Sequence, residues 1–313
     1  MRTSLVSLGT ATWLTVACAN DVDDPHAFVV PVTSERGTEY AIHASATLEP
    51  GAERTIATYS RRKWSLDAQF TEVAFTSAGP VHHWAFYATD AAGLTEGEAL
   101  DESRPLDALR LGNALFLLGG DGAVLPDDVG LQLPAQPGYL LEIHYLNTTD
   151  HTIVDSSTLT LCAASTPREH TAALHVLGKG AFTVDAHSET SVSATCANTA
   201  ITPTHLFAVT PHMHELGTTA RVFVDGTEIV SMPFSVHDQR TRVFPEVVLE
   251  PGARIANTCV YLNNTDRTVK SGPLASNEMC MLLAWAWPAG SIHNGLGANT
   301  GLAVPAENNC TAP

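Results

Sequence analysis

The stretch LFAVTPHMHELG, residues 206–217, ends an apolar run with two histidines in His-x-His spacing. The run at residues 206–209 predicts the end of a buried strand, and residues two apart on a strand point to the same face. His212 and His214 are therefore able to hold one metal ion between them. The spacing alone is weak, because it also arises by chance in a chain with 14 histidines.

A second motif, Glu278-Met279-Cys280, stands far downstream and directly before another apolar run at residues 281–287. A thioether beside two imidazoles favours copper, because Cu(I) tolerates sulfur where zinc prefers a thiolate or a carboxylate. The plainer interpretation of Met279 is the first residue of a core strand. The His-x-His pair is what favours the metal site.

The composition is that of a globular β protein. The chain has 313 residues, 44% of them hydrophobic and 16% charged, which suits two domains of ordinary size. Short alternating runs broken by Gly, Pro, Asn and Asp recur, and long patterns of period 3.6 are hard to find, which favours β-sandwiches. The formal charge of −17 argues against nucleic acid and anionic membrane surfaces as partners.

The N-terminal residues indicate export. An apolar segment at residues 5–17 is too short to span a bilayer and ends in LTVAC, residues 14–18. This end resembles a bacterial lipobox with Cys18 as the lipidated first residue of the mature protein; plain secretion with cleavage nearby stays open. We assign residues 1–18 to the signal and lipobox and 19–27 to a tether. The expected location is the periplasm, the outer membrane or the cell surface, with a lipid anchor as the only membrane contact.

Two β domains are predicted, at residues 28–165 and 166–313, with the polar run 166–171 at the boundary. The strands expected from alternation lie at residues 40–44, 71–75, 158–161, 220–224, 242–244, 258–261 and 281–287. Asp225-Gly226 predicts a hairpin turn. The pattern at residues 104–118 fits a short helix or a strand equally well.

The first domain contains two further histidine motifs. His82 and His83 are adjacent at the start of the apolar strand VHHWAFY, residues 81–87. Adjacent strand residues face opposite ways, so a shared metal requires an irregular or end-of-strand position. His144 stands in the strand YLLEIHY, residues 139–145, where a lone histidine is usually a hydrogen-bonded core residue. Together the three imidazoles suit copper or zinc.

The six cysteines form no C-x-x-C pair, which argues against a zinc ribbon or a thioredoxin-type site. Their wide dispersal fits structural disulfides in an oxidising compartment.

With these motifs in order, the chain resembles the copper type II, ascorbate-dependent monooxygenases, the family of peptidylglycine α-hydroxylating monooxygenase and dopamine β-monooxygenase. The resemblance runs from about residue 40 to residue 310 and covers four motifs in the family's order. It implies an all-β fold of two consecutive jelly-roll-like β-sandwich domains. Each domain would carry one copper site, and the two sites would face each other across a solvent-filled cleft.

The resemblance also implies roles for single residues. The copper that relays electrons would be held by His82, His83 and His144. The catalytic copper, where the substrate C–H bond is attacked, would be held by His212, His214 and Met279. The implied cofactor is copper, two ions per chain, with ascorbate or another reductant as co-substrate, and the partners are O2 and a small molecule. The implied disulfides are Cys196–Cys310 and Cys259–Cys280, which leaves Cys162 as a buried free thiol.

The chain also departs from the family. In the peptide-amidating enzyme an arginine two residues before the His-x-His pair helps bind the substrate carboxylate, and here that position is Thr210. The asparagine and tyrosine that follow the methionine ligand correspond to Met281 and Leu283, and the disulfides of the first domain are missing. These departures argue against a peptidylglycine substrate and favour an uncharged one.

These motifs are compatible with three functions to different degrees. The first is a copper monooxygenase that hydroxylates an activated C–H bond. The alternative is a non-catalytic, exported copper-binding lipoprotein for storage or delivery. A β-sandwich adhesion or scaffold protein is disfavoured, because two complete ligand sets are present. A measurement of oxygen consumption with ascorbate distinguishes the monooxygenase from the non-catalytic lipoprotein. The oligomeric state has no signal in the sequence.

Overall fold

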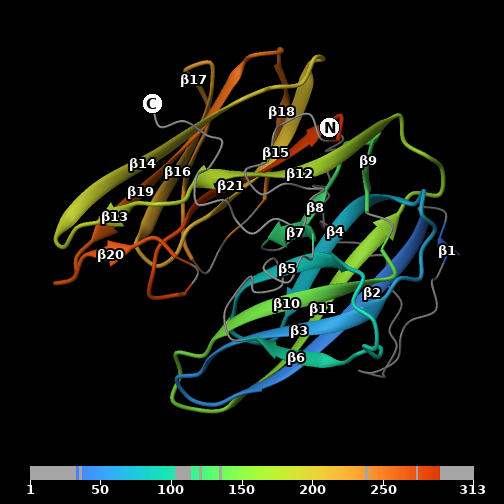
Figure 1. Ribbon diagram of the computed structural model, residues 1–313, viewed down its shortest axis with the longest axis horizontal. Helices are drawn as coiled ribbons and strands as arrows, with labels where there is room; N and C mark the ends of the chain where they lie inside the picture. Colours follow the sequence, from blue (N-terminus) through green and yellow to red (C-terminus); the bar gives the residue numbers. More distant parts are fainter. Residues whose placement is uncertain are drawn as a thin grey trace, which may run out of the picture.

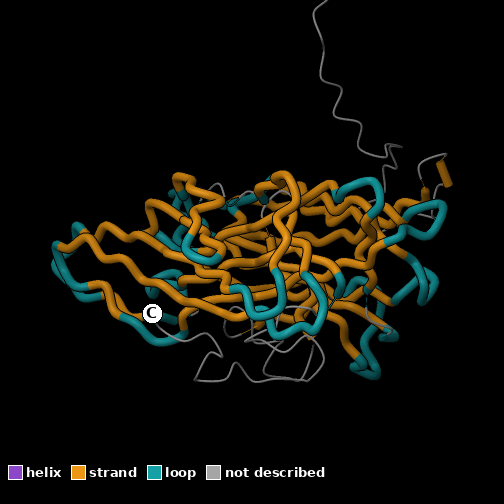
Figure 2. The backbone as a smooth tube through the Cα atoms, turned by 90° about the horizontal axis from the view of Figure 1, so that it is seen from above, coloured by secondary structure: helices purple, strands orange, loops and turns teal. Residues whose placement is uncertain are grey.

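In the computed structural model, the chain is described at residues 33–34, 37–102, 114–119, 122–133, 136–236, 239, 241–272 and 274–289. Every regular element in these residues is a strand (Figures 1 and 2). Within the same ranges there is no helical segment with the length and apolar character needed to cross a bilayer. The signal at residues 1–18, with Cys18, and the tether at residues 19–27 lie outside the described residues and stay predictions.

The first half of the chain forms a sandwich of two sheets. One sheet has the order β6-β3-β10-β5-β7, and the other includes β1-β2-β11-β4-β9, with β8 also on β4. Phe75 on β4 stacks on Trp84 on β5 with ring centroids 5.3 Å apart, so the two sheets share one core. The strands are β1 (Thr33–Ser34), β2 (Gly37–Leu48), β3 (Glu53–Arg61), β4 (Gln69–Ser77), β5 (Val81–Thr89), β6 (Ala99–Glu102), β7 (Ala114–Gly119), β8 (Gly122–Val124), β9 (Val129–Gln132), β10 (Gly138–Leu146) and β11 (Ile153–Ala163).

The second half forms another sandwich. One sheet contains β12-β21-β15-β18, the other has the order β14-β19-β16-β17, and β13 pairs with β20. Leu206, Val222 and Ile255 belong to the core cluster between these two sheets. The strands are β12 (His170–Lys179), β13 (Thr183–Val184), β14 (Ser188–Ala197), β15 (Thr204–His212), β16 (Gly217–Val224), β17 (Thr227–Pro233), β18 (Arg242–Leu249), β19 (Arg254–Asn263), β20 (Val269–Lys270) and β21 (Cys280–Trp287).

The two halves are joined by a shared sheet. Strands β9 and β12 pair in parallel, with His170 opposite Val129, which makes one ten-stranded sheet across both sandwiches (Figure 1). Phe207 and Trp285 of the second half also belong to the core cluster of the first. The predicted boundary between residues 165 and 166 falls between β11 and β12, and the division into two domains stays a prediction.

The strands expected from alternation are confirmed, because each predicted range lies within one of β2, β4, β11, β16, β18, β19 and β21. Asp225 and Gly226 both have positive φ, 47° and 81°, which is the backbone that a two-residue hairpin between β16 and β17 requires. In the segment that the pattern left undecided, residues 114–119 form strand β7.

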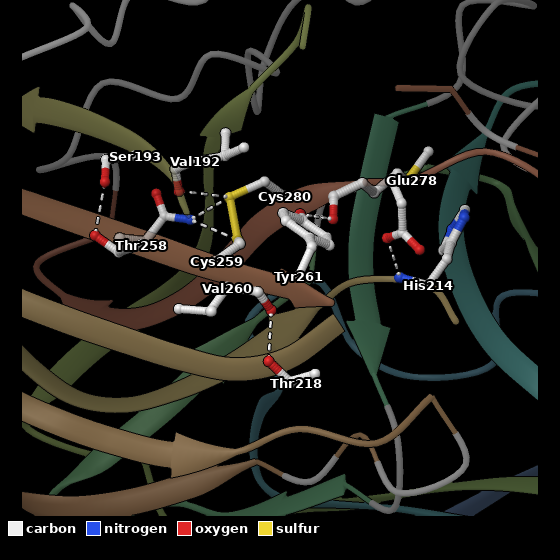
Figure 3. The surroundings of a disulfide bond; sticks show 12 residues. Val192, Ser193, His214, Thr218, Thr258, Cys259, Val260, Tyr261, Glu278 and Cys280 are labelled. Carbon is white, nitrogen blue, oxygen red and sulfur yellow. Dashed lines mark hydrogen bonds between the residues drawn. A yellow bond between two sulfur atoms is a disulfide. The ribbon is translucent and has the colours of Figure 1, made fainter. Parts of the chain in front are cut away.

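One predicted disulfide, Cys259–Cys280, is present and links β19 to the start of β21 (Figure 3). Cys196 is disulfide-bonded as well, but its predicted partner Cys310 lies outside the described residues. Cys162 is a buried thiol.

We expect the double change Cys259→Ala, Cys280→Ala to lower the free energy of unfolding by about 3 kcal/mol, because the bridge closes a loop of this length in the unfolded chain. Urea denaturation measures the loss. Cys162→Ala is the matched control, because it removes a buried sulfur without opening that bridge. An unchanged denaturation midpoint in the double variant would contradict the prediction.

Candidate metal centre

His82 and His83 lie at an irregularity of strand β5. His144 on β10 pairs with His83, whereas the next residue, Tyr145, pairs with Val81, so His82 is the extra residue of a β-bulge. A bulge re-aims side chains, which removes the strict alternation that would send adjacent histidines to opposite faces. The irregular position that the sequence required for a shared metal is therefore present.

The three histidines of the first half face one another. Each pair among His82, His83 and His144 has ring centroids 5.0 Å apart, and one ligand atom from each residue lies within 4.8 Å of the others. All three are buried, with His144 fully so. This group offers an all-imidazole set of ligands for one ion.

His212 ends strand β15, and His214 follows in the adjoining turn. Met213, between them, is fully buried and packs in the cluster inside the second half, around Cys259 and Cys280. Alternation then directs the two flanking imidazoles the other way, toward the first half. Their ring centroids are 5.4 Å apart.

Glu278 fixes the turn that carries His214. Its buried carboxylate accepts hydrogen bonds from the backbone N–H of His214 at 3.0 Å and of Leu216 at 2.7 Å (Figure 3). Burial raises the pKa of this carboxyl to about 7, against the opposing effect of these N–H groups. Two members of the Glu-Met-Cys motif thus have separate roles: Glu278 holds the turn, and Cys280 forms the disulfide.

Met279 stands directly before β21, and the register of β15 and β21 indicates where it lies relative to the His-x-His pair. His212 pairs with Met281, and continuing this antiparallel register by two residues sets Met279 opposite His214. Directly opposite residues point to the same face of a sheet. Both methionines are partly buried against the core cluster of the first half, so two thioethers are candidates on the face that carries the histidines.

The two histidine sets form a single cluster. His82 is 5.0 Å from His214 and His83 is 5.0 Å from His212, measured between ring centroids, which equals the spacing inside the first set. All five imidazoles are between 0% and 8% exposed. The packing of the two halves thus brings both sets of imidazoles together and buries them.

Four of these histidines have a buried ring nitrogen with no hydrogen-bond partner among the described residues, which is available to a metal. Nδ1 of His212 bonds to Gln239 at 2.7 Å, Nδ1 of His214 to the Asn277 carbonyl at 3.0 Å, and Nε2 of His144 to Glu53 at 3.0 Å. In each of these three the second ring nitrogen is buried without a hydrogen-bond partner among the described residues, as is Nε2 of His83. Such orphaned atoms are costly unless a metal takes them, and orientation of a ligand histidine through its other nitrogen is typical of metal sites.

The histidines are also in the protonation state that a metal needs. Burial, together with the neighbouring imidazoles, lowers the pKa of His212 to about 3 and of His214 to about 4, against the opposing effect of their hydrogen bonds to Gln239 and to the Asn277 backbone. Burial, followed by the repulsion of four nearby histidines, holds the pKa of His83 well below 6.5. Burial lowers the pKa of His144 too, with Glu53 opposing. Neutral imidazole is the form that binds metal, so this donor set fits copper.

Sequence reasoning missed Gln239 and Glu53, and it gave Glu278 no role of its own. Gln239 stands in the connection between β17 and β18, and Glu53 begins β3. Both touch the cluster only because distant segments come together, so no local spacing marks them. For Glu278 the sequence contained one weak indication of a role, which is its position directly before Met279 in the Glu-Met-Cys motif.

The comparisons with known proteins also indicate similarity to copper monooxygenases. Residues 159–294 match the family model of the copper type II ascorbate-dependent monooxygenase, C-terminal domain. The human "Putative DBH-like monooxygenase protein 2" is 26% identical over 254 residues, which cover 69% of this chain and 49% of that protein. The chain thus spans about half the length of this curated relative.

Solved structures give weaker likenesses. The major capsid protein P2 of bacteriophage PM2 is 8% identical with a TM-score of 0.32, and the match covers 80% of this chain and 98% of that one. The VP2 subviral particle of infectious bursal disease virus is 12% identical with a TM-score of 0.21, covering 83% and 74%. Neither carries an argument about function.

Proposed function

We propose that this chain, which belongs to the copper type II, ascorbate-dependent monooxygenase family, hydroxylates an activated C–H bond of an uncharged small molecule with O2 and a reductant such as ascorbate. The observation that carries the proposal is the meeting of five buried histidines, four of them with a buried ring nitrogen that has no hydrogen-bond partner among the described residues. Copper bound there would supply the one-electron redox chemistry through which such enzymes use oxygen.

The chain's own residues prepare this chemistry in three ways. The packing of the two halves buries the imidazoles, and burial lowers the pKa of His212 and of His214, which keeps these two neutral. Gln239, Asn277 and Glu53 each hold one ring nitrogen and so direct the other into the cluster. Glu278 fixes the turn of the His-x-His pair, so the ligand nitrogens are in place before a metal arrives.

The position of Thr210 supports an uncharged substrate. Its buried hydroxyl lies 2.8 Å from that of Thr241 and accepts a hydrogen bond from Nε1 of Trp285 at 3.4 Å. In the peptide-amidating enzyme, the arginine at this position helps bind the substrate carboxylate. The neutral, hydrogen-bonded Thr210 side chain offers no such cation.

The decisive experiment is oxygen consumption by the copper-loaded protein with ascorbate, across a panel of uncharged aromatic and aliphatic substrates, with product analysis for a hydroxyl group. Consumption that depends on substrate and yields hydroxylated product supports the proposal. Stable copper binding without any ascorbate oxidation would instead favour the non-catalytic storage or delivery protein.

We expect His144→Ala to lower the bound copper from about two ions to about one per chain, because one of three imidazoles in the first set is removed. Metal analysis after gel filtration measures the ratio, and a circular dichroism spectrum checks the fold. His151→Ala is the matched control, because the His151 side chain is exposed and its ring bonds only to Asp150 among the described residues. An unchanged ratio in folded His144→Ala would exclude His144 as a ligand.

A further inference from the structure

A stack of three rings lies outside the histidine cluster, at the end of strand β21. The ring of Trp287 is nearly parallel to that of His170, with centroids 3.7 Å apart, and to that of His205, with centroids 3.5 Å apart. Trp287 is half-buried, and the two histidine side chains are 25% and 21% exposed, so the stack reaches the protein surface. Aromatic faces attract positive charge, so two imidazoles in their neutral form stabilise a positive charge that develops on the indole. The stack therefore favours the loss of one electron from Trp287.

Glu246 on β18 supplies a proton acceptor for this indole. Nε1 of Trp287 donates to Oε2 of Glu246 at 3.2 Å, and Oε1 of the same carboxylate bonds to Nδ1 of His205 at 2.6 Å. An indole that has lost one electron is a strong N–H acid, and a carboxylate within hydrogen-bond reach is placed to accept its proton. Nε1 of Trp285 donates instead to the Thr210 hydroxyl at 3.4 Å, which is not a base. Of these two indoles, Trp287 is the one whose oxidation is coupled to proton loss.

A row of side chains connects the stack to the His-x-His pair. Alternate residues of β21 share one face, and they pair with β15 as Trp287–His205, Trp285–Ala208, Leu283–Thr210 and Met281–His212. Neighbours in this row are two residues apart on the strand, so their Cα atoms are about 7 Å apart. Trp285 is buried and stands along the row between Trp287 and His212. A second indole thus divides the path from the histidines to the surface into shorter steps.

We propose that Trp287 is a redox-active residue that carries oxidising equivalents from the copper site to the protein surface through Trp285. The proposal rests on the proposed function, because the oxidant is the one that remains at the copper site when O2 is reduced without substrate. Trp285 gives one electron to that oxidant and regains it from Trp287, which loses the Nε1 proton to Glu246. Ascorbate then gives one electron to Trp287 at the surface and releases a proton to water. Glu246 returns its proton to Nε1, and the ascorbyl radical leaves.

The first test needs no copper. A laser flash with a dissolved photosensitiser oxidises indoles of the metal-free protein, and transient absorption distinguishes the neutral indole radical from its protonated cation. We expect Trp287→Phe to remove most of the radical signal, because the other described tryptophans, Trp64, Trp84 and Trp285, are between 2% and 6% exposed. A signal of unchanged size in Trp287→Phe would overturn the redox role of Trp287.

The proton acceptor is tested in the same experiment by Glu246→Gln. We expect the protonated cation to live at least about tenfold longer in this variant, because an amide does not take the Nε1 proton. Glu228→Gln is the matched control, because the Glu228 carboxylate bonds to Arg221 on another sheet. A cation that decays as fast in Glu246→Gln as in the unchanged chain would overturn the coupling to Glu246.

The second test uses the copper-loaded protein with O2 and limiting ascorbate, without substrate, and peptide mass spectrometry locates oxidised tryptophan. We expect oxygen-adduct formation at Trp287 and a several-fold decrease of it in Trp285→Phe, which interrupts the row. Trp64→Phe is the matched control, because Trp64 is equally buried but packs against Tyr40 and Tyr139 in the first half. Should Trp285→Phe not fold, Trp287→Phe replaces it, and the adducts should then accumulate at Trp285.

Two outcomes of the second test contradict the path. Equal oxidation of Trp287 in folded Trp285→Phe would mean that a diffusing oxidant reaches the surface directly. Trp285 without adducts in Trp287→Phe would mean that no oxidising equivalent enters the row. Copper binding without O2 consumption would instead contradict the proposed function, whereas the flash experiment on metal-free protein tests Trp287 and Glu246 independently of it.

Discussion

Met279→Ile should abolish ascorbate-driven oxygen consumption almost entirely while the protein stays folded. Isoleucine is apolar and close in volume to methionine, and such swaps usually cost less than about 1.5 kcal/mol of stability. Met279 is only partly buried, so its packing is not critical. The thioether, in contrast, is the ligand that we propose beside His212 and His214, where sulfur would favour Cu(I). Activity should therefore fall by orders of magnitude, and carbon monoxide binding to the reduced protein should weaken.

Met281→Ile is the matched control, because Met281 pairs directly with His212 and faces the same way. If Met279 is the ligand, Met281→Ile keeps most of its activity and the normal carbon monoxide affinity. A loss in Met281→Ile with activity kept in Met279→Ile would move the sulfur ligand by two residues. Loss of the fold in Met279→Ile would show that this methionine is a core residue, and the copper interpretation of the motif would be wrong.

The sequence predicted the elements whose signal is local. Alternation of apolar and polar residues located the strands around residues 40–44 and 158–161, because one face of each strand is buried. The Asp225-Gly226 dipeptide predicted the hairpin turn, and both residues have the positive φ that this turn requires. The adjacency of His82 and His83 led to a specific structural expectation. Since a regular strand separates them, their joint use required an irregularity, and the register of β5 and β10 contains one at that position.

What depends on long-range packing could not be predicted. The parallel pairing of β9 with β12 has no signature in either strand, so the continuous sheet was not foreseen. The contact of His83 with His212 is set by how the two sandwiches pack together, which neither motif encodes. Gln239 is one residue of the connection between β17 and β18, and no local pattern marks it. Its role follows from its hydrogen bonds to His212 and to the His82 carbonyl, which are distant in the sequence.

The metal-free protein should lose stability steeply as the pH falls from about 6.5 to about 4. Burial depresses the pKa of His83, His144, His212 and His214, to about 3 for His212 and about 4 for His214. In this window the unfolded chain binds protons at these residues and the folded chain does not. Stability therefore rises with pH across the window, and each histidine contributes up to about 1.4 kcal/mol per pH unit.

Glu278 acts in the opposite direction. Because its pKa is raised from 4.5 to about 7, the folded chain binds a proton there that the unfolded chain has released, so its contribution falls as the pH rises through this range. One carboxyl is outnumbered by four histidines, and the net slope keeps the sign that the histidines give.

Urea denaturation of the metal-free protein at pH 7.5, 6, 5 and 4 would measure this slope. His212→Gln removes one buried imidazole and should flatten the curve between about pH 4 and 6.5. His151→Gln is the control, because that side chain is exposed in the folded protein. A free energy of unfolding that stays level down to pH 4 would mean that water reaches the histidines in the folded chain, which is incompatible with a buried cluster.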